Sequence, residues 1–299
     1  MPELPEVENL RLGLLKYIKG QKILEVKVNK PKLVSSKSTK RQISKSKVLE
    51  FEGELEGESF LTVERRAKNL IFKITHDKYI LAHLKMTGQF IYESKNKNKK
   101  IIGGHPILIS ETTLPNKHTH IIFHLNNGTL YYNDTRMFGY VLYYKNTESF
   151  EKENHFKKLG LEPQDEKFTV QYFAKALENK KSKIKTVLLN QDIVVGVGNI
   201  YADESLFEAK IAPTRMASSL TKQEISKLHK AIIRIIEKAI SVGGSSVATY
   251  RLIDDTKGNY AREHKVYGKV GQKCVKCNHL LKKIIIGGRT TIFCPNCQK

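Results

Sequence analysis

The sequence predicts an α+β protein of more than one domain: an N-terminal helix, an antiparallel β-sandwich, a polar linker, a group of helices and a zinc-binding hairpin. Three observations predict this order. A helical apolar pattern opens the chain, short β-rich segments follow as far as about Tyr144, and four cysteines in two Cys-x-x-Cys pairs close it. With 299 residues, the chain is long enough for two domains that each have a core.

The first helix is expected over residues 4–19. Its apolar residues recur at helical spacing: Val7, Leu10, Leu14 and Ile18. Acidic residues lie near its beginning and Gly20 follows its end, which is typical of helix boundaries. A helix therefore begins almost at the N-terminus.

Short β-rich segments come next, over Lys22–Val28, Leu70–Ile74, Tyr79–Leu84, Ile121–Leu125 and Thr129–Tyr132. Asn127-Gly128 lies between the last two and predicts a tight hairpin turn. The segment from Ser94 to Lys117 is rich in lysine, contains two prolines and has no sustained period, so we expect an exposed loop there. Together these segments predict an antiparallel sandwich or barrel.

The second half of the chain is predicted to be helical. Residues 148–168 are polar and contain Pro163, which suits a linker. A helix is expected from Thr221 to Val242, where Thr221 and Glu224 have capping-box spacing. The expected domains are therefore a β-sandwich domain over 1–147, a linker over 148–168, a helical domain over 169–262 and a zinc module over 263–299.

The four cysteines predict one structural zinc ion. Their spacing, two residues within each pair and sixteen between the pairs, fits a closed four-cysteine shell: Cys274, Cys277, Cys294 and Cys297. Two strands are expected between the pairs, with Gly287-Gly288-Arg289 at the tip. Arg289 is then either a ligand for an anion or a solvated turn residue.

The charge of the chain favours a polyanionic partner. Lys and Arg number 52 against 30 Asp and Glu, a formal net charge of +22. Nucleic acid is the first candidate, and a surface charged only for solubility is the alternative. No apolar run reaches the roughly 18 residues that a membrane span needs. We therefore expect a cytoplasmic protein.

Pro2 is a candidate nucleophile. Removal of Met1 would give it a free secondary amine, and an α-amino group has a pKa of about 7.7 to 8.0 against about 10.4 for lysine. Attack on a sugar C1′ would form a cationic iminium, which acidifies the C2′ protons for elimination. Glu3 and Glu6 lie beside it as candidate proton carriers. The alternative is that Pro2 and the acidic residues only begin a helix.

Four motifs together resemble formamidopyrimidine-DNA glycosylase, an oxidised-purine glycosylase and abasic-site lyase family that includes endonuclease VIII. They are Met-Pro-Glu-Leu-Pro-Glu-Val-Glu at 1–8, Arg65-Arg66-Ala67-Lys68, Gly-Val-Gly-Asn-Ile-Tyr-Ala at 196–202 and the cysteine hairpin with Arg289. The resemblance covers the whole chain. It implies a β-sandwich, a helix-two-turn-helix and a zinc finger. It also implies a monomer whose substrate is duplex DNA that contains oxidised bases or abasic sites.

The resemblance also implies roles for single residues. Pro2 would form the Schiff base, Glu3 would donate the proton for base release with Glu6 in support, and Lys68 would assist β-elimination. Arg289 would bind phosphate and assist δ-elimination. The implied DNA-binding residues are Met86, His118, Arg136, Phe138, Lys180 and Asn199. Met86, Arg136 and Phe138 resemble the set that fills the space of an extruded base.

Two positions depart from the family pattern, because Lys85 stands where glycine is frequent and Met137 where a second basic residue is usual. Lys180 lies among other lysines, so a neighbour could hold its place. Two other functions stay open. One is an endonuclease VIII-like glycosylase for oxidised pyrimidines, and the other is a zinc-ribbon protein that binds damaged DNA without cutting it.

Overall fold

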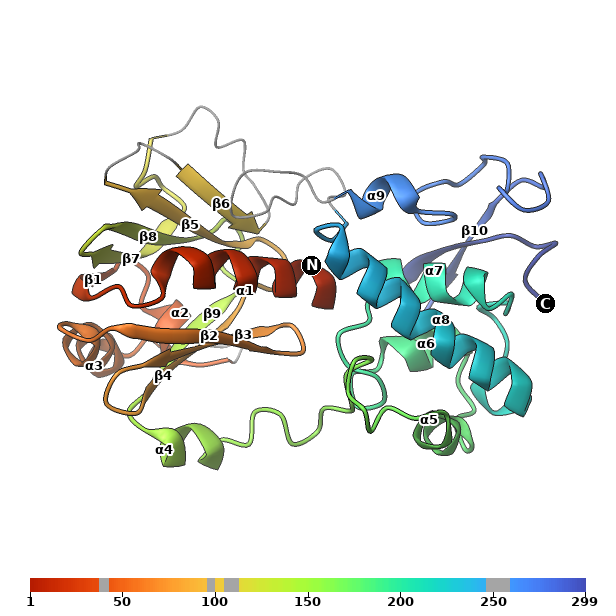
Figure 1. The fold of residues 1–299 in the computed structure, drawn as a ribbon, viewed down its shortest axis with the longest axis horizontal. Coiled ribbons are helices and arrows are strands. Elements are labelled where there is room, and N and C mark those ends of the chain that lie inside the picture. Colours follow the sequence, from red (N-terminus) through yellow and green to blue (C-terminus); the bar gives the residue numbers. More distant parts are fainter. Residues whose placement is uncertain (38–42, 96–99, 105–112, 246–258) are drawn as a thin grey trace. The chain divides into compact units, whose positions relative to one another are not determined.

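Figure 1 shows the computed structural model, which describes residues 1–37, 43–95, 100–104, 113–245 and 259–299. The chain divides into two compact units. Unit 1 contains residues 1–2 and 6–155 together with the segment that begins at Gly243. Unit 2 contains residues 3–5, 156–242 and 259–299. The expected domain boundaries remain a prediction.

Unit 1 is a sandwich of two antiparallel sheets (Figure 1). The five-stranded sheet has the order β1 (Ile23–Val28), β7 (Thr119–Leu125), β8 (Gly128–Asp134), β5 (Gly88–Ser94) and β6 (Lys100–Gly104). The four-stranded sheet has the order β2 (Phe60–Arg66), β3 (Asn69–Ile74), β4 (Lys78–His83) and β9 (Tyr140–Tyr144). The rings of Phe72 and Phe90, one from each sheet, meet edge to face with centroids 5.5 Å apart. Aromatic packing of this kind fills the core between the sheets.

Helix α1 (Leu4–Ile18) confirms the first expected helix. Val7, Leu10, Leu14 and Ile18 lie in the core of unit 1, whereas Leu4 lies in the core of unit 2. The sequence analysis did not predict α2 (Lys32–Ser35) and α3 (Lys45–Leu55). Val48, Phe51 and Leu55 recur at helical spacing in α3 and pack on the core of unit 1, so the sequence held a helical pattern that the sequence analysis did not use.

Two predictions about loops in unit 1 need correction. Strand β6 pairs with β5 inside the segment from Ser94 to Lys117 that was expected to be a loop; residues 96–99 and 105–112 lie outside the described residues. The expected hairpin is present, but Leu125 pairs with Gly128, so Asn126 and Asn127 form its turn. A Cβ on Gly128 would lie 2.4 Å from the carbonyl oxygen of Glu93, which explains this glycine by close packing rather than by turn conformation.

Unit 2 is mainly helical, with α5 (Val170–Leu177), α6 (Ile184–Leu189), α7 (Asn199–Glu208), α8 (Lys222–Ser241), α9 (Tyr260–Glu263) and a 3₁₀ turn at Ala217–Ser219. The expected capping box of α8 is confirmed, because Thr221 and Glu224 bond to each other's backbone N–H groups. Helix α4 (Thr147–Lys152) of unit 1 begins at the expected linker. In the parts of the chain that the structure describes, no helix is long and apolar enough to cross a membrane.

Candidate active site

Glu3 caps the beginning of helix α7 within unit 2. Its side chain is only 4% exposed. Its carboxylate accepts hydrogen bonds from the backbone N–H groups of Gly198 at 2.8 Å, Ile200 at 3.0 Å and Tyr201 at 3.4 Å. The first N–H groups of a helix have no partner inside the helix and carry partial positive charge, so an anion there is well solvated. One carboxylate is therefore held in a single orientation.

The glycines before α7 leave room for this arrangement. A Cβ on Gly198 would lie 2.4 Å from Cδ of Glu3. Gly196 has φ +89° and a Cβ there would lie 2.4 Å from Cδ1 of Leu4. The N–H of Leu4 also donates to the Gly196 carbonyl at 3.0 Å. The glycines of the Gly-Val-Gly-Asn motif are thus explained by the close approach of the N-terminal segment.

Pro2 and Glu6 flank residues 3–5 in the sequence, and both belong to unit 1. Pro2 is buried and directly precedes Glu3. Glu6 is buried, and its Oε1 accepts the backbone N–H of Ser245 at 2.7 Å. Gly244, with φ +77°, precedes this contact. Glu6 therefore anchors the backbone at Ser245.

Lys68 occupies a two-residue turn between β2 and β3. Arg66 pairs with Asn69, which leaves Ala67 and Lys68 as the turn, and Ala67 has φ +57°. Lys68 is only 6% exposed. The guanidinium of Arg65 donates to the carbonyl of Ala67 at 3.0 Å. A partly buried arginine thus fixes the turn that carries the lysine.

Glu8 connects that arginine to helix α1. Its carboxylate accepts from Nε of Arg65 at 2.8 Å and from Nη2 of Arg11 at 2.7 Å. Arg11 also donates to the carbonyl of Val63 in β2 at 3.2 Å. Burial alone would raise the pKa of Glu8, but the hydrogen bonds and charges of the two arginines outweigh it and lower that pKa. We refer to Glu8, Arg11 and Arg65 as the Glu8 clamp.

Asp134 joins two turns that carry candidate DNA-binding residues. It is fully buried at the end of β8. Its Oδ1 accepts from the hydroxyl of Thr87 and from the N–H of Arg136 at 3.2 Å. Its Oδ2 accepts from the N–H of Gly139 at 2.8 Å. The turn after β4 and the turn after β8 are therefore held by one carboxylate.

Met86 and Phe138 project from these two turns and are 38% and 47% exposed. The guanidinium of Arg136 lies 4.6 Å from the centroid of the Phe138 ring. Met137 has φ +51° and packs against the core of unit 1. Met137, one of the two residues that depart from the family pattern, thus packs inward, and Asp134 connects the turns that carry Met86, Arg136 and Phe138.

Two histidines lie at the same end of the sandwich. His118 is half-buried, and its carbonyl accepts the N–H of Asp134 at 3.1 Å. His83, which the sequence analysis did not select, accepts the N–H of Lys85 at its Nδ1 at 3.0 Å. Burial first, and then the charges of nearby lysines, hold its pKa well below the usual value. His83 lies two residues before Lys85 and three before Met86, and this proximity to two selected positions could have indicated it.

The hairpin of unit 2 consists of β10 (Lys282–Ile286) and β11 (Arg289–Phe293). The predicted tip shifts by one residue, because Gly287 and Gly288 make the turn and Arg289 pairs with Ile286. Asn199, the first residue of α7, donates from Nδ2 to the carbonyl of Thr290 at 3.0 Å. Asn199 is thereby joined to the strand that carries the exposed Arg289.

Lys180 is not part of the hydrogen bonding that joins Asn199 to the strand of Arg289. It is exposed beyond the end of α5, and its carbonyl accepts the N–H of Ser218 at 3.2 Å. Within the described residues, no hydrogen bond links it to Asn199 or Arg289. Its predicted contact with DNA stays a prediction.

A buried ion pair, which the sequence analysis did not predict, lies beneath the hairpin. Lys185 of α6 donates to the carboxylate of Asp203 of α7, and the other oxygen of Asp203 accepts the N–H of Ile292 at 3.1 Å. Burial raises the pKa of Asp203 to about 6, although Lys185 opposes this shift. Helix α7 is thus bonded to β11 of the hairpin.

Glu204 makes a second connection from α7. Its carboxylate accepts the backbone N–H groups of Lys265, Val266 and Tyr267 at 2.8 to 3.0 Å. This segment leads into the cysteine hairpin. Asp203 and Glu204, consecutive acidic residues of α7, therefore hold strand β11 and the segment before the cysteines by backbone hydrogen bonds.

The four cysteines form the predicted metal site. Their sulfur atoms all lie within 4.8 Å of one another. Sγ of Cys274 is 3.8 Å from Sγ of Cys297, and Sγ of Cys277 is 3.4 Å from Sγ of Cys294. A tetrahedral zinc ion with Zn–S bonds of about 2.3 Å requires sulfur separations of about 3.8 Å. The residues fit one structural Zn²⁺ with a closed thiolate shell.

Comparison with known proteins identifies the family. The formamidopyrimidine-DNA glycosylase N-terminal domain matches residues 1–141, the H2TH domain of the same glycosylase matches 159–251, and a zinc finger found in FPG and IleRS matches 271–299. The formamidopyrimidine-DNA glycosylase of Listeria monocytogenes is 41% identical over 300 residues, with 100% of each chain covered.

Solved structures of the Lactococcus lactis enzyme are also similar. A mutant in complex with DNA containing Fapy-dG has a TM-score of 0.85 and 36% identity, with 100% of both chains covered. A complex with DNA containing an abasic site has a TM-score of 0.85 and 36% identity, with 99% of both chains covered. Full-length identity above one third, a shared fold and the domain matches lead to one conclusion: the chain belongs to the formamidopyrimidine-DNA glycosylase family.

Proposed function

We propose that this protein is a bifunctional DNA glycosylase and abasic-site lyase that excises oxidised purines, such as 8-oxoguanine and formamidopyrimidines, from duplex DNA. The observation that carries this proposal is the Glu3 carboxylate, held by three backbone N–H groups of α7 directly after Pro2. It fixes a proton-carrying group next to the amine that acts as nucleophile. Family membership and the relatives' complexes with Fapy-dG and abasic DNA support the substrate.

The chemistry begins at the N-terminus. After removal of Met1, the secondary amine of Pro2 attacks C1′ of the damaged nucleotide and the C1′–N bond to the base breaks. Glu3 donates the proton with which the base leaves, and the proton that the amine loses passes to the sugar ring oxygen as the ring opens, which leaves an iminium cation between Pro2 and C1′. Glu3 is the proton carrier for this exchange, and Glu6 supports it by anchoring the adjoining backbone.

Elimination follows from the iminium. It acidifies the C2′ protons, so loss of one expels the 3′ phosphate in β-elimination, and loss of a further proton expels the 5′ phosphate in δ-elimination. Lys68, fixed in its turn by Arg65, assists the first elimination. Arg289 binds phosphate and assists the second.

The remaining residues bind DNA. Met86, Arg136 and Phe138 project into the duplex and fill the space of the extruded nucleotide, which offsets an unstacking cost of a few kcal/mol. His118, Asn199 and Lys180 contact the backbone. The zinc ion, held by its four cysteines, keeps the hairpin folded. A DNA substrate also implies a cytoplasmic location for the enzyme.

Borohydride trapping tests this proposal. Reduction of the iminium on a duplex with a single 8-oxoguanine should give a stable protein–DNA adduct, and peptide mapping should place the crosslink on Pro2. Protein that retains Met1 is the matched control and should give no adduct. A crosslink on Lys68 would contradict the mechanism, and damage binding without any adduct would favour a non-catalytic damage-binding protein.

A panel of defined lesions tests the substrate class. Duplexes with 8-oxoguanine, a formamidopyrimidine or an oxidised pyrimidine should be incised at different rates, with the purine lesions fastest. Preferential incision of the oxidised pyrimidine would instead assign the activity of endonuclease VIII.

A further inference from the structure

Basic side chains gather at one end of the four-stranded sheet. Leu70 of β3 pairs with Ala82 of β4, and His83 of β4 pairs with Tyr140 of β9. The turn before β3, which contains Lys68, therefore lies beside the end of β4, and Lys85 comes two residues after that end. Nearby positive charges repel one another, so such a cluster favours a bound anion.

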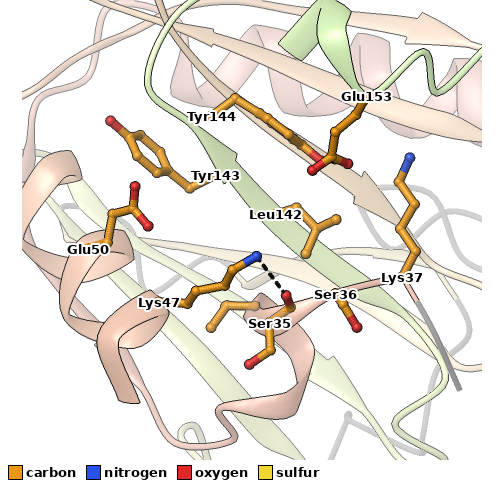
Figure 2. Close-up of a pocket in the computed structure, with 10 residues that line it drawn as sticks. Ser35, Ser36, Lys37, Lys47, Glu50, Leu142, Tyr143, Tyr144 and Glu153 are labelled. Atoms are coloured by element: carbon orange, nitrogen blue, oxygen red, sulfur yellow. Dashed lines mark hydrogen bonds between the residues drawn. The ribbon is translucent and has the colours of Figure 1, made fainter. Parts of the chain in front are cut away.

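The charges around His83 show how closely these groups interact. The pKa of His83 is lowered first by burial and then by the charges of Lys85, Lys68 and Lys37. Burial also lowers the pKa of Lys37 to about 8; Glu153 opposes this shift and Lys85 adds to it. Figure 2 shows Lys37 and Glu153 on the wall of one small pocket. Glu153 thus offsets part of the charge of Lys37.

Lys85 adopts a backbone conformation that glycine would adopt more easily. Its φ is +50°, in the left-handed region where a Cβ is unfavourable. Its N–H donates to Nδ1 of His83 at 3.0 Å. Its ammonium group lies 5.8 Å from the centroid of the Tyr140 ring. Strained residues of this kind are frequent at sites where the side chain has a function.

We propose that Lys85 binds a phosphate of the DNA backbone. Lys85 lies in the turn that also carries Met86, and it would supply a second cation near Lys68. This inference rests on the proposed function, because it takes duplex DNA as the ligand. The bond to His83 holds the backbone of Lys85, the ring of Tyr140 lies beside its ammonium group, and a phosphodiester there would place a negative charge near Lys85, Lys68 and Lys37. Lys85 is thus an additional determinant of affinity and not of base recognition.

The salt dependence of binding tests this role. The probe is a duplex with a reduced abasic site, which the enzyme cannot cleave through a Schiff base. Lys85→Gln should weaken binding several-fold, and the slope of log affinity against log salt should become shallower by about 0.9, the value for one lost phosphate contact. Lys85→Arg keeps the charge and should restore the wild-type slope.

Lys210 provides a matched control, because it is a lysine in the left-handed region with φ +61° in unit 2. Lys210→Gln should leave both affinity and slope unchanged. Glycine variants separate backbone from charge: Lys85→Gly and Lys210→Gly should both keep the melting temperature of the wild type or exceed it, and only Lys85→Gly should lose affinity.

An unchanged salt slope in Lys85→Gln would overturn the inference, and so would an equal loss of affinity in Lys210→Gln. This test measures binding to DNA that the enzyme does not incise. Failure of this inference therefore differs from failure of the proposed function, which would show as the absence of a trapped adduct on 8-oxoguanine DNA.

Discussion

Lys68 of unit 1 and Glu3 of unit 2 are held by different kinds of contact. In unit 1, Lys68 depends on the Glu8 clamp, in which side chains bond mainly to other side chains. In unit 2, the buried acids Glu3, Asp203 and Glu204 accept backbone N–H groups. A clamp of side chains depends on charge, whereas backbone capping depends on the close approach of two chain segments. The two units should therefore respond differently to substitution and to pH.

Loss of the zinc ion should have the largest effect, and it should be confined to unit 2. Cys294→Ser removes one of four thiolates, so the hairpin with Arg289 should unfold while unit 1 keeps its sandwich. Incision of lesion DNA should be abolished. Two-dimensional NMR should show the loss of signals from 271–299 and the retention of those from β2 and β3. Normal incision by the zinc-free protein would show that the hairpin is dispensable.

Gly198→Ala should break the backbone cap of Glu3. Its Cβ would lie 2.4 Å from Cδ of Glu3, so the carboxylate must move, at a cost of about 1 to 3 kcal/mol for overpacking. Displacement of a catalytic group by about 1 Å should reduce single-turnover base release by roughly 10²-fold.

Gly53→Ala is the control for that substitution, because a Cβ on this glycine of α3 meets nothing within 4 Å. It should leave base release unchanged and stabilise the helix by about 0.5 to 1 kcal/mol. Equal rates in the two alanine variants would mean that the orientation of Glu3 does not matter for base release.

Glu8→Gln should slow one step more than the others. It removes the charge that pairs with Arg65, so the turn of Lys68 becomes less well fixed and β-elimination on abasic DNA should slow about tenfold, equivalent to about 1.4 kcal/mol. The Pro2 adduct should form at nearly the wild-type rate and accumulate, as measured by borohydride trapping over time.

Glu64→Gln is its control, because Glu64 pairs with Lys73 at the exposed surface of the same β-hairpin. Exposed pairs contribute about 0 to 1 kcal/mol, so all steps should stay near wild type. Glu8→Asp should recover part of the β-elimination rate. If Glu8→Gln slows adduct formation and elimination equally, the clamp supports the fold and does not position Lys68.

The smallest expected effect is that local stability near Asp203 and local stability near Glu8 depend on pH in opposite directions. Burial raises the pKa of Asp203 to about 6, so its contribution to stability is fully present below its unfolded value of about 4 and is lost as the pH rises through about 6. The pKa of Glu8 is lowered, so its contribution is present above its unfolded value and is lost as the pH falls through the folded value.

Hydrogen exchange of the backbone amides measures this difference in each unit. Between about pH 6 and pH 4, wild-type protein should gain stability near β11 relative to Asp203→Asn. Near β2 the wild-type protein should lose stability relative to Glu8→Gln, and it should do so only as the pH falls through the lowered pKa of Glu8. Parallel responses in the two units would show that the local environments of these carboxylates do not control their stability.

The sequence by itself determined the features that depend on short spacing. The cysteine pairs predicted the zinc site, the capping box and apolar stripe predicted α8, and the position of Pro2 predicted an amine nucleophile. Each signal lies within a few residues along the chain, where covalent geometry and helical periodicity limit the possible structures. The β-rich segments that the sequence analysis named correspond to β1, β3, β4, β7 and β8, whereas it did not name β2, β5, β6, β9 or helix α3.

Tertiary structure decided how the candidate catalytic residues are held. Glu3 meets Gly198, Glu8 meets Arg65 and Thr87 meets Asp134, pairs that are 195, 57 and 47 positions apart. Polar side chains carry no periodic pattern, and a carboxylate can accept bonds from any donor that folding brings near it. Close packing around glycines and burial of the acids select these partners, and both exist only once the cores of the two units have formed.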